Sequence, residues 1–203
     1  MKTVFYFLVL FCFTLIAKSQ DDHTAQIKKL RTEKNVELRS KKNSPLQKKD
    51  RKAFDHLNYF PIDKAWCKDV EFALVENGDT IDIITSSGKP KQFYVFGKIT
   101  FCNDGTPESL NAYMRIWPEG YESDYPPSLF IPFKDQTSGE ETYGGGRYMD
   151  IDVPAESGLI KLDFNLCYNP YCSYGDGFSC PLPPEVNDLD FEVVAGEKNY
   201  GGH

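Results

Sequence analysis

The densest group of residues suited to chemistry is one glycine-rich loop, Thr142-Tyr143-Gly144-Gly145-Gly146-Arg147-Tyr148. Three glycines allow backbone amides to approach a ligand closely, and successive N–H groups can cradle an anion. The adjacent Arg147 offers a planar guanidinium that binds carboxylate or phosphate through two parallel hydrogen bonds. We therefore expect residues 142–148 to bind a small anionic or polar ligand, with Tyr143 and Tyr148 as flat walls.

The direction of the Arg147 side chain decides between three interpretations. In a strand it shares parity with Met149, Ile151 and Val153, so it should point to the apolar side of the sheet. A charge in that position needs a polar partner or a wet pocket. Arg147 therefore belongs to a ligand pocket, to a buried structural ion pair, or to a surface bend. On the first interpretation, an Arg147→Ala variant loses an anionic ligand and keeps its fold.

A second polar stretch runs from residue 162 to residue 187 and is dense in Asn and Pro. Asn165, Tyr168 and Asn169 are candidate ligand-binding residues. The alternative is that the amides tie the loop backbone, as Asn side chains commonly do in turns. The pattern also predicts that Leu162, Phe164 and Leu166 face the core.

Two carboxylates could do acid–base work if the protein is an enzyme, namely Asp163 and Glu197, with Asp135 as another candidate. Such a pair needs pKa values that its surroundings separate. A histidine-based triad or zinc site is not expected, because only His23, His56 and His203 occur. No metal or cofactor motif is present, so neither is predicted.

The chain begins with the pattern of a cleaved secretory signal over residues 1–19, a charged start followed by a short apolar run and small residues. This predicts an exported protein, periplasmic or extracellular, without a membrane-spanning segment after cleavage. Export permits disulfides. The favoured bridge is Cys172–Cys180, across a loop with two glycines, and Cys67–Cys102 is a second candidate bridge. Cleavage of the signal removes Cys12 and leaves five of the six cysteines, so at least one thiol stays free.

The rest of the chain has the period-two alternation of strands and no alternation of strands with helices. The expected strands are 66–76, 79–85, 91–102, 110–117, 129–133, 147–153, 159–166 and 189–193. Asn77-Gly78 is a tight-turn signal, so the first two should form a hairpin. The predicted fold is a mostly antiparallel β-sandwich or meandering barrel of about eight strands.

The predicted organisation has four parts. After the signal, a basic arm over residues 20–43 is helical or disordered, a single β domain spans 44–198, and residues 199–203 form a tail. A leading helix should begin at Ser44-Pro45. The β domain is acidic, within a chain of net charge −7, which argues against nucleic acid as a partner. The pattern does not specify an oligomeric state.

Several stretches together resemble the uncharacterised family named domain of unknown function 1684, from about residue 44 to 198. They include 132–139, 142–148, 162–165, 168–170, 180–184 and 195–198, with Gln136 standing where a small residue is expected. The resemblance implies no activity, but it selects the same two loops.

Three functions stay open at this point. The first is a module of the cell envelope that binds a small anionic or polar ligand. The second is a hydrolase on an envelope substrate that uses Asp163 with Glu197 or Asp135. The third is a structural or assembly protein whose polar motifs hold loops. A loop with Trp117, Tyr121 and Tyr125 could stack on a sugar ring in the first two cases.

Overall fold

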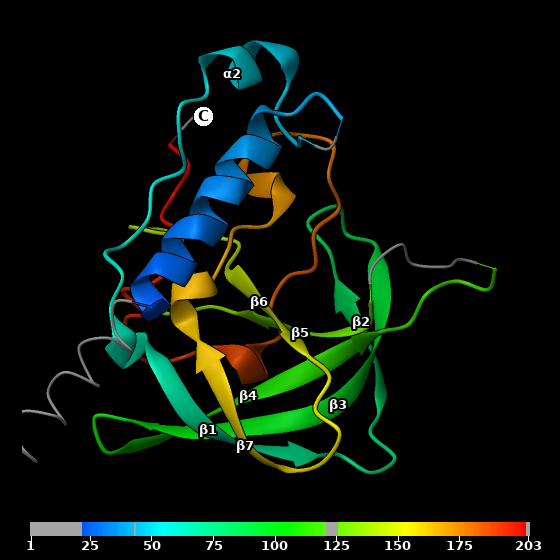
Figure 1. The fold of residues 1–203 in the computed structure, drawn as a ribbon. Coiled ribbons are helices and arrows are strands. Elements are labelled where there is room, and N and C mark those ends of the chain that lie inside the picture. The colour runs from blue at the N-terminus through cyan, green and yellow to red at the C-terminus, as the bar shows by residue number, and fades with distance from the viewer. Residues whose placement is uncertain (1–21, 43, 121–125, 202–203) are drawn as a thin grey trace, which may run out of the picture.

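A computed structural model describes residues 22–42, 44–120 and 126–201. The expected signal over residues 1–19 therefore lies outside the described residues, as do Tyr121 and Tyr125. The described part is mostly antiparallel β, a curled half-barrel sheet of seven strands with an N-terminal helix over residues 22–39. Figure 1 shows the strands curling around the lower part of the molecule, with the helix, in blue, lying above them.

The strands run antiparallel in the order β6-β5-β4-β3-β1-β7, and β2 pairs with β3. Their bounds are β1 Cys67–Leu74, β2 Thr80–Ile84, β3 Pro90–Asn103, β4 Thr106–Arg115, β5 Ser128–Phe133, β6 Arg147–Asp152 and β7 Gly158–Asp163. Sequential strands are neighbours from β3 to β6, whereas β7 returns to pair with β1.

The expected hairpin between residues 66–76 and 79–85 is wrong. The long strand β3 pairs with β2 along its first part and with β1 along its second, so β1 and β2 follow each other along β3. Asn77 has a φ of 53° as expected for a tight turn, but the turn only bends the chain. The Tyr94 hydroxyl holds this bend by accepting a hydrogen bond of 2.9 Å from the Gly78 amide.

The expected last strand, 189–193, is also wrong, because this segment forms no strand. Leu189 and Val193 lie in the core. Their backbone amides bond to a neighbouring loop instead of a strand ladder. The amide of Leu189 donates to the Lys134 carbonyl at 2.8 Å, and that of Val193 donates to the Asp135 carboxylate at 2.8 Å.

One face of the sheet forms the main hydrophobic core, because alternate residues of each strand point to the same side. Its strand members are Val70, Phe72, Ile99, Phe101, Leu110, Ala112, Leu129, Ile131, Phe133, Met149 and Leu162. The alternation ends after β7, where Phe164–Leu166 form a 3₁₀ turn capped by Asp163. The turn rotates Leu166 outward to 42% exposure, so its predicted core position is wrong, and Cys167 is buried instead.

The helices pack around a second hydrophobic cluster formed by Leu38, Leu46, Phe54, Leu57 and Tyr174. The short helix α2 spans Lys48–Ala53 and begins three residues after the expected start at Pro45. The hydroxyl of Ser44 instead donates to the Leu38 carbonyl and accepts from the Leu46 amide, which closes the turn after the first helix. No helix among the described residues is long and apolar enough to cross a membrane.

Candidate functional site

Arg147 begins β6 and points into the core, as its parity predicts, with 0% exposure. Its guanidinium lies 3.1 Å from Oδ1 of Asp135, which is equally buried, and donates to the carbonyls of Val193 at 2.8 Å and Ala195 at 2.5 Å. The other Asp135 oxygen accepts from the Thr137 hydroxyl at 2.7 Å. Thus protein groups hold both terminal nitrogens of the guanidinium, and the geometry favours the structural ion pair over the ligand pocket.

The glycine-rich loop before Arg147 serves close packing. Gly146 has a φ of 86°, and a Cβ there would lie 2.6 Å from the Phe133 carbonyl oxygen. Thr142 is buried and bonds to the Thr137 hydroxyl at 2.9 Å. The Tyr143 ring folds back over the loop and lies close to Gly145. A Cβ added at Gly145 would lie 2.4 Å from this ring. Gly144 in turn packs against Gly139. These contacts describe a tightly packed bend.

The two candidate asparagines also hold backbone. The Asn165 amide group donates to the Asp63 carbonyl at 2.8 Å, and its oxygen accepts from the Asp63 amide at 3.1 Å. The Asn169 side chain donates to the Lys198 carbonyl at 2.9 Å. Both side chains are buried. Their hydrogen bonds join the loop to segments that are distant in sequence.

The candidate acid–base carboxylates are both engaged by protein groups. Glu197 is 1% exposed and accepts hydrogen bonds from the Tyr174 hydroxyl at 2.5 Å and from the backbone amide of Asn169 at 2.9 Å. The Nζ atom of Lys34, from the N-terminal helix, lies 2.8 Å from its other oxygen. Asp163 lies 2.7 Å from the ring of His23. Burial and the Glu197 charge raise the pKa of Tyr174 well above its usual value, so this hydroxyl stays a donor.

The hollow best suited to a ligand lies on the other face of the sheet, and we call it the aromatic pocket. It has a volume of about 680 Å³ and lies between strands β3 to β6 and the loop over residues 168–181. Its aromatic walls are Phe93, Trp117, Phe130, Tyr148, Tyr168, Tyr171 and Phe178. Polar groups are few, and ligand pockets are typically apolar with a few placed polar groups. Of the predicted ligand-binding residues, Tyr148, Tyr168 and Asn169 line it.

Ring contacts join the floor of this pocket across three strands. Phe93 of β3 stacks on Phe130 of β5 with centroids 5.5 Å apart, and Phe130 meets Tyr148 of β6 edge-on at 4.7 Å. Tyr148 in turn contacts Tyr168 at 5.7 Å. Backbone hydrogen bonds of 2.9 Å in both directions fix Tyr168 beside Tyr148. The floor is therefore built on strands, which position side chains more rigidly than loops do.

Charged groups of both signs lie in the aromatic pocket. Lys91 and Arg115 come from the ends of β3 and β4, and burial lowers the pKa of Lys91, with the nearby Arg115 charge lowering it further. Asp150 comes from β6, where the Tyr168 hydroxyl donates to its carboxylate. Partial burial raises the pKa of Asp150, while that hydrogen bond and Lys34 oppose the shift.

The predicted disulfide Cys172–Cys180 is present in the loop that covers the pocket. Cys180 itself lines the pocket, so the bridge fixes part of the wall. The second candidate bridge, Cys67–Cys102, is absent: Cys67, Cys102 and Cys167 are free thiols among the described residues.

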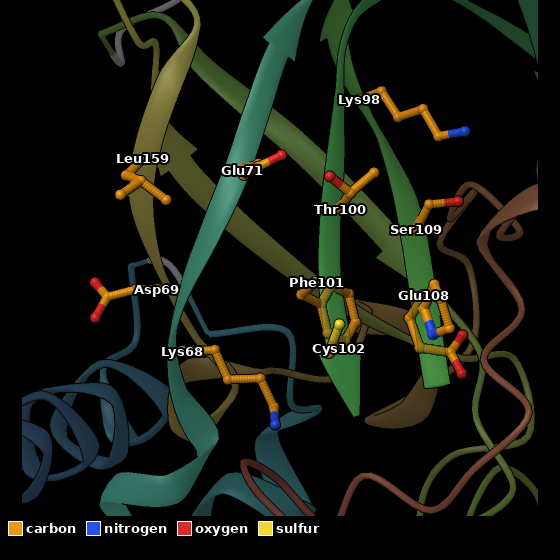
Figure 2. Close-up of a pocket in the computed structure, with 11 residues that line it drawn as sticks. Lys68, Asp69, Glu71, Lys98, Thr100, Phe101, Cys102, Glu108, Ser109 and Leu159 are labelled. Atoms are coloured by element: carbon orange, nitrogen blue, oxygen red, sulfur yellow. The ribbon is translucent and has the colours of Figure 1, made fainter. Parts of the chain in front are cut away.

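A second hollow of about 800 Å³ lies on the outer face of β1, β3 and β4 (Figure 2). Its residues carry both charges, including Lys68, Asp69, Glu71, Lys98 and Glu108. The side chains in Figure 2 stand apart along the strands instead of meeting at one point. This pattern is typical of the solvent face of a twisted sheet, so the aromatic pocket is the stronger candidate site.

Sequence reasoning missed Lys91, Phe93, Arg115, Phe130 and Asp150 as pocket residues. One available signal was an aromatic side chain where alternation expects an outward polar one. Phe130 lies between the buried Leu129 and Ile131. An outward-facing aromatic side chain of this kind indicates a face that another segment or a ligand covers.

Comparisons with known proteins agree with this fold. The family model described as "Protein of unknown function (DUF1684)" matches residues 52–198. An uncharacterized protein from Haloarcula marismortui, solved by solution NMR, is 33% identical with a TM-score of 0.70, over 92% of this chain and 99% of that chain. The comparison with curated proteins finds no match. The chain therefore belongs to the DUF1684 family.

Proposed function

We propose that the protein is a binding module for a small anionic ligand with a flat ring, held in the aromatic pocket. The observation that carries this proposal is the pair of cations, Lys91 and Arg115, placed together at the edge of an aromatic floor. Two like charges in a partly buried site disfavour each other. An anionic group between them removes that cost, while the rings offer stacking surface to the rest of the ligand.

The aromatic contacts of Arg115 support this arrangement. Its guanidinium lies 4.6 Å from the Trp117 ring centre and 5.3 Å from that of Phe93. Such stacking holds a guanidinium flat, and a planar guanidinium suits the two parallel hydrogen bonds of carboxylate or phosphate. A ligand anion at this edge would place its ring over Phe130 and Tyr148. The export inferred from residues 1–19 suggests that the ligand is encountered in the cell envelope.

The test is a titration with a panel of ring compounds, followed by Trp fluorescence and by the shift in melting temperature. Benzoate, phenyl phosphate and a uronic acid are the anionic probes, and benzamide and glucose are the neutral controls. We expect the anionic probes to bind at least tenfold more tightly. Arg115→Ala should remove that preference, whereas Lys98→Ala, on the outer face of the same sheet (Figure 2), should retain it. Equal binding of charged and neutral probes, or no saturable binding, contradicts the proposal.

A further inference from the structure

Three side chains with metal-binding atoms meet where the N-terminal helix packs on one end of the β1–β7 ladder. They are His23 of the N-terminal helix, Cys67 at the start of β1 and Asp163 at the end of β7. One ligand atom from each lies within 4.8 Å of the other two. We propose that these three residues form a binding site for a divalent transition-metal ion of the zinc class.

Strand register places two of the three ligands. Cys67 and Asp163 are direct partners in the antiparallel β1–β7 ladder, so their side chains point to the same face of the sheet. Side chains at such opposite positions have Cβ atoms about 4.5–5.5 Å apart. This spacing allows a thiolate and a carboxylate to bind one ion without a change in the backbone.

The third ligand comes from the helix that packs over this strand end. The His23 Nε2 atom lies 2.7 Å from Oδ2 of Asp163, and the two side chains are only 15% and 12% exposed. Zinc binds at about 2.0–2.3 Å from N, O and S ligands, which sets neighbouring ligand atoms about 3–4 Å apart in a tetrahedron. A small rotation of the three side chains therefore suffices to admit an ion.

The surroundings orient Asp163 for this role. Its Oδ1 atom accepts hydrogen bonds from the backbone amide of Asn165 at 3.0 Å and from its side-chain amide at 2.8 Å. That leaves Oδ2 directed at His23. Partners behind a ligating carboxylate are a regular feature of metal sites, because they fix which oxygen faces the metal.

The chemistry of the three ligands selects the metal. Thiolate and imidazole are poor ligands for Ca²⁺ and Mg²⁺, which prefer oxygen, and good ligands for zinc and related ions. A cysteine binds zinc as the thiolate, so binding at Cys67 releases the thiol proton. Three protein ligands also leave a fourth position for water, as in zinc sites with an open coordination position.

Sequence reasoning did not predict this site, because no ligand spacing in the chain matches a metal motif. The helix that supplies His23 also lies before residues 52–198, which the family model matches. The site therefore depends on tertiary packing of the helix against β1 and β7.

The experiment uses the whole protein with its disulfide intact, titrated with Zn²⁺ against a chromophoric chelator and with Co²⁺ as a spectroscopic probe. We expect one zinc ion per chain, a zinc-dependent rise in melting temperature, and a Co²⁺ absorption band typical of thiolate ligation. Cys67→Ser should abolish the band and weaken Zn²⁺ binding by more than about 100-fold, since loss of a mere outer partner already costs 10–100-fold. His23→Gln and Asp163→Asn should weaken binding while keeping the band's thiolate character.

Two variants serve as matched controls. Cys102→Ser removes another free thiol of the sheet, and His56→Gln removes an exposed histidine. Both control variants should bind Zn²⁺ and Co²⁺ as tightly as wild type does. The proposal is overturned if wild type shows no thiolate–Co²⁺ band, if Cys67→Ser keeps it, or if the controls lose affinity as much as the three ligand variants. Melting temperatures without metal identify any variant that fails to fold. If one of the three ligand variants is unfolded, zinc binding by the other two decides whether the proposal holds.

Discussion

Two arginines on opposite faces of the same sheet show how similar residues acquire different roles. Arg147 of β6 lies 5.4 Å from the ring centre of Phe133 and is fully buried on the inner face. Arg115, at the end of β4, lies 4.6 Å from the ring centre of Trp117 and lines the aromatic pocket on the outer face. Both pack on aromatic rings, and both have a carboxylate in the same region.

The difference lies in what completes each site. Around Arg147 the final segment of the chain supplies carbonyls from Val193 and Ala195, and Asp135 supplies the charge. Around Arg115 the loop over residues 168–181 leaves a hollow of about 680 Å³. A charge completed by buried protein groups holds the fold together, and we propose that the charge beside the hollow takes part in ligand binding.

The largest effect that tests this comparison is the loss of stability on removing Arg147. Arg147→Ala removes the guanidinium that neutralises the buried Asp135 carboxylate and donates to the carbonyls of Val193, Ala195 and Glu197. We expect a loss of about 3–5 kcal/mol in the free energy of unfolding, measured by urea denaturation. This revises the sequence-based expectation that the variant keeps its fold.

The matched control is Arg115→Ala, which should lose only about 1 kcal/mol because its stacking contacts remain partly solvated. Equal losses from the two arginine variants would show that the open and closed sites do not differ in structural role.

The next effect concerns the wall of the aromatic pocket. Replacing Cys172 and Cys180 with Ser removes a cross-link that closes a short loop, which costs about 2–3 kcal/mol in the chain-entropy model. Because Cys180 lines the pocket, the same variant should also weaken binding of the anionic ring probes. Denaturation and probe titration measure the two effects, and Cys102→Ser is the thiol control. Unchanged probe binding would mean that the loop does not shape the site.

The sequence was sufficient for the fold class because alternation records which side of a strand is buried. The same rule correctly turned Arg147 inward, and loop spacing predicted the Cys172–Cys180 bridge. It failed where the backbone leaves regular geometry. The 3₁₀ turn after β7 exposes Leu166, which strand alternation had placed in the core.

The candidate sites were less predictable, because each depends on segments that meet only in the folded chain. The loop around Tyr168 covers the outer face of β5 and β6, and His23 reaches β7 from a helix outside the β domain. No local pattern encodes either contact. A local motif such as the three glycines is visible in sequence, yet here it serves close packing of backbone.

The smallest expected effect is a pH-dependent one at Asp150, on the open side of the comparison. Partial burial raises its pKa in the folded state, so the folded protein binds this proton more tightly than the unfolded chain does. The stabilisation is complete below the ordinary carboxyl pKa of about 4 and is lost as the pH rises through the raised value. Relative to Asp150→Asn, wild type should therefore lose stability as the pH rises from about 4 through the raised pKa. The difference should stay under about 1 kcal/mol because the group faces solvent.

Denaturation of wild type and Asp150→Asn across this pH range measures the effect, and Tyr168→Phe sharpens it. The Tyr168 hydroxyl stabilises the charged carboxylate, so its removal should raise the pKa of Asp150 further and steepen the loss of stability with pH. A difference between wild type and Asp150→Asn that stays constant with pH would show that water solvates this carboxylate as fully in the folded protein as in the unfolded chain. The pocket floor would then be wetter than its aromatic walls imply, and the anion preference of Lys91 and Arg115 correspondingly weaker.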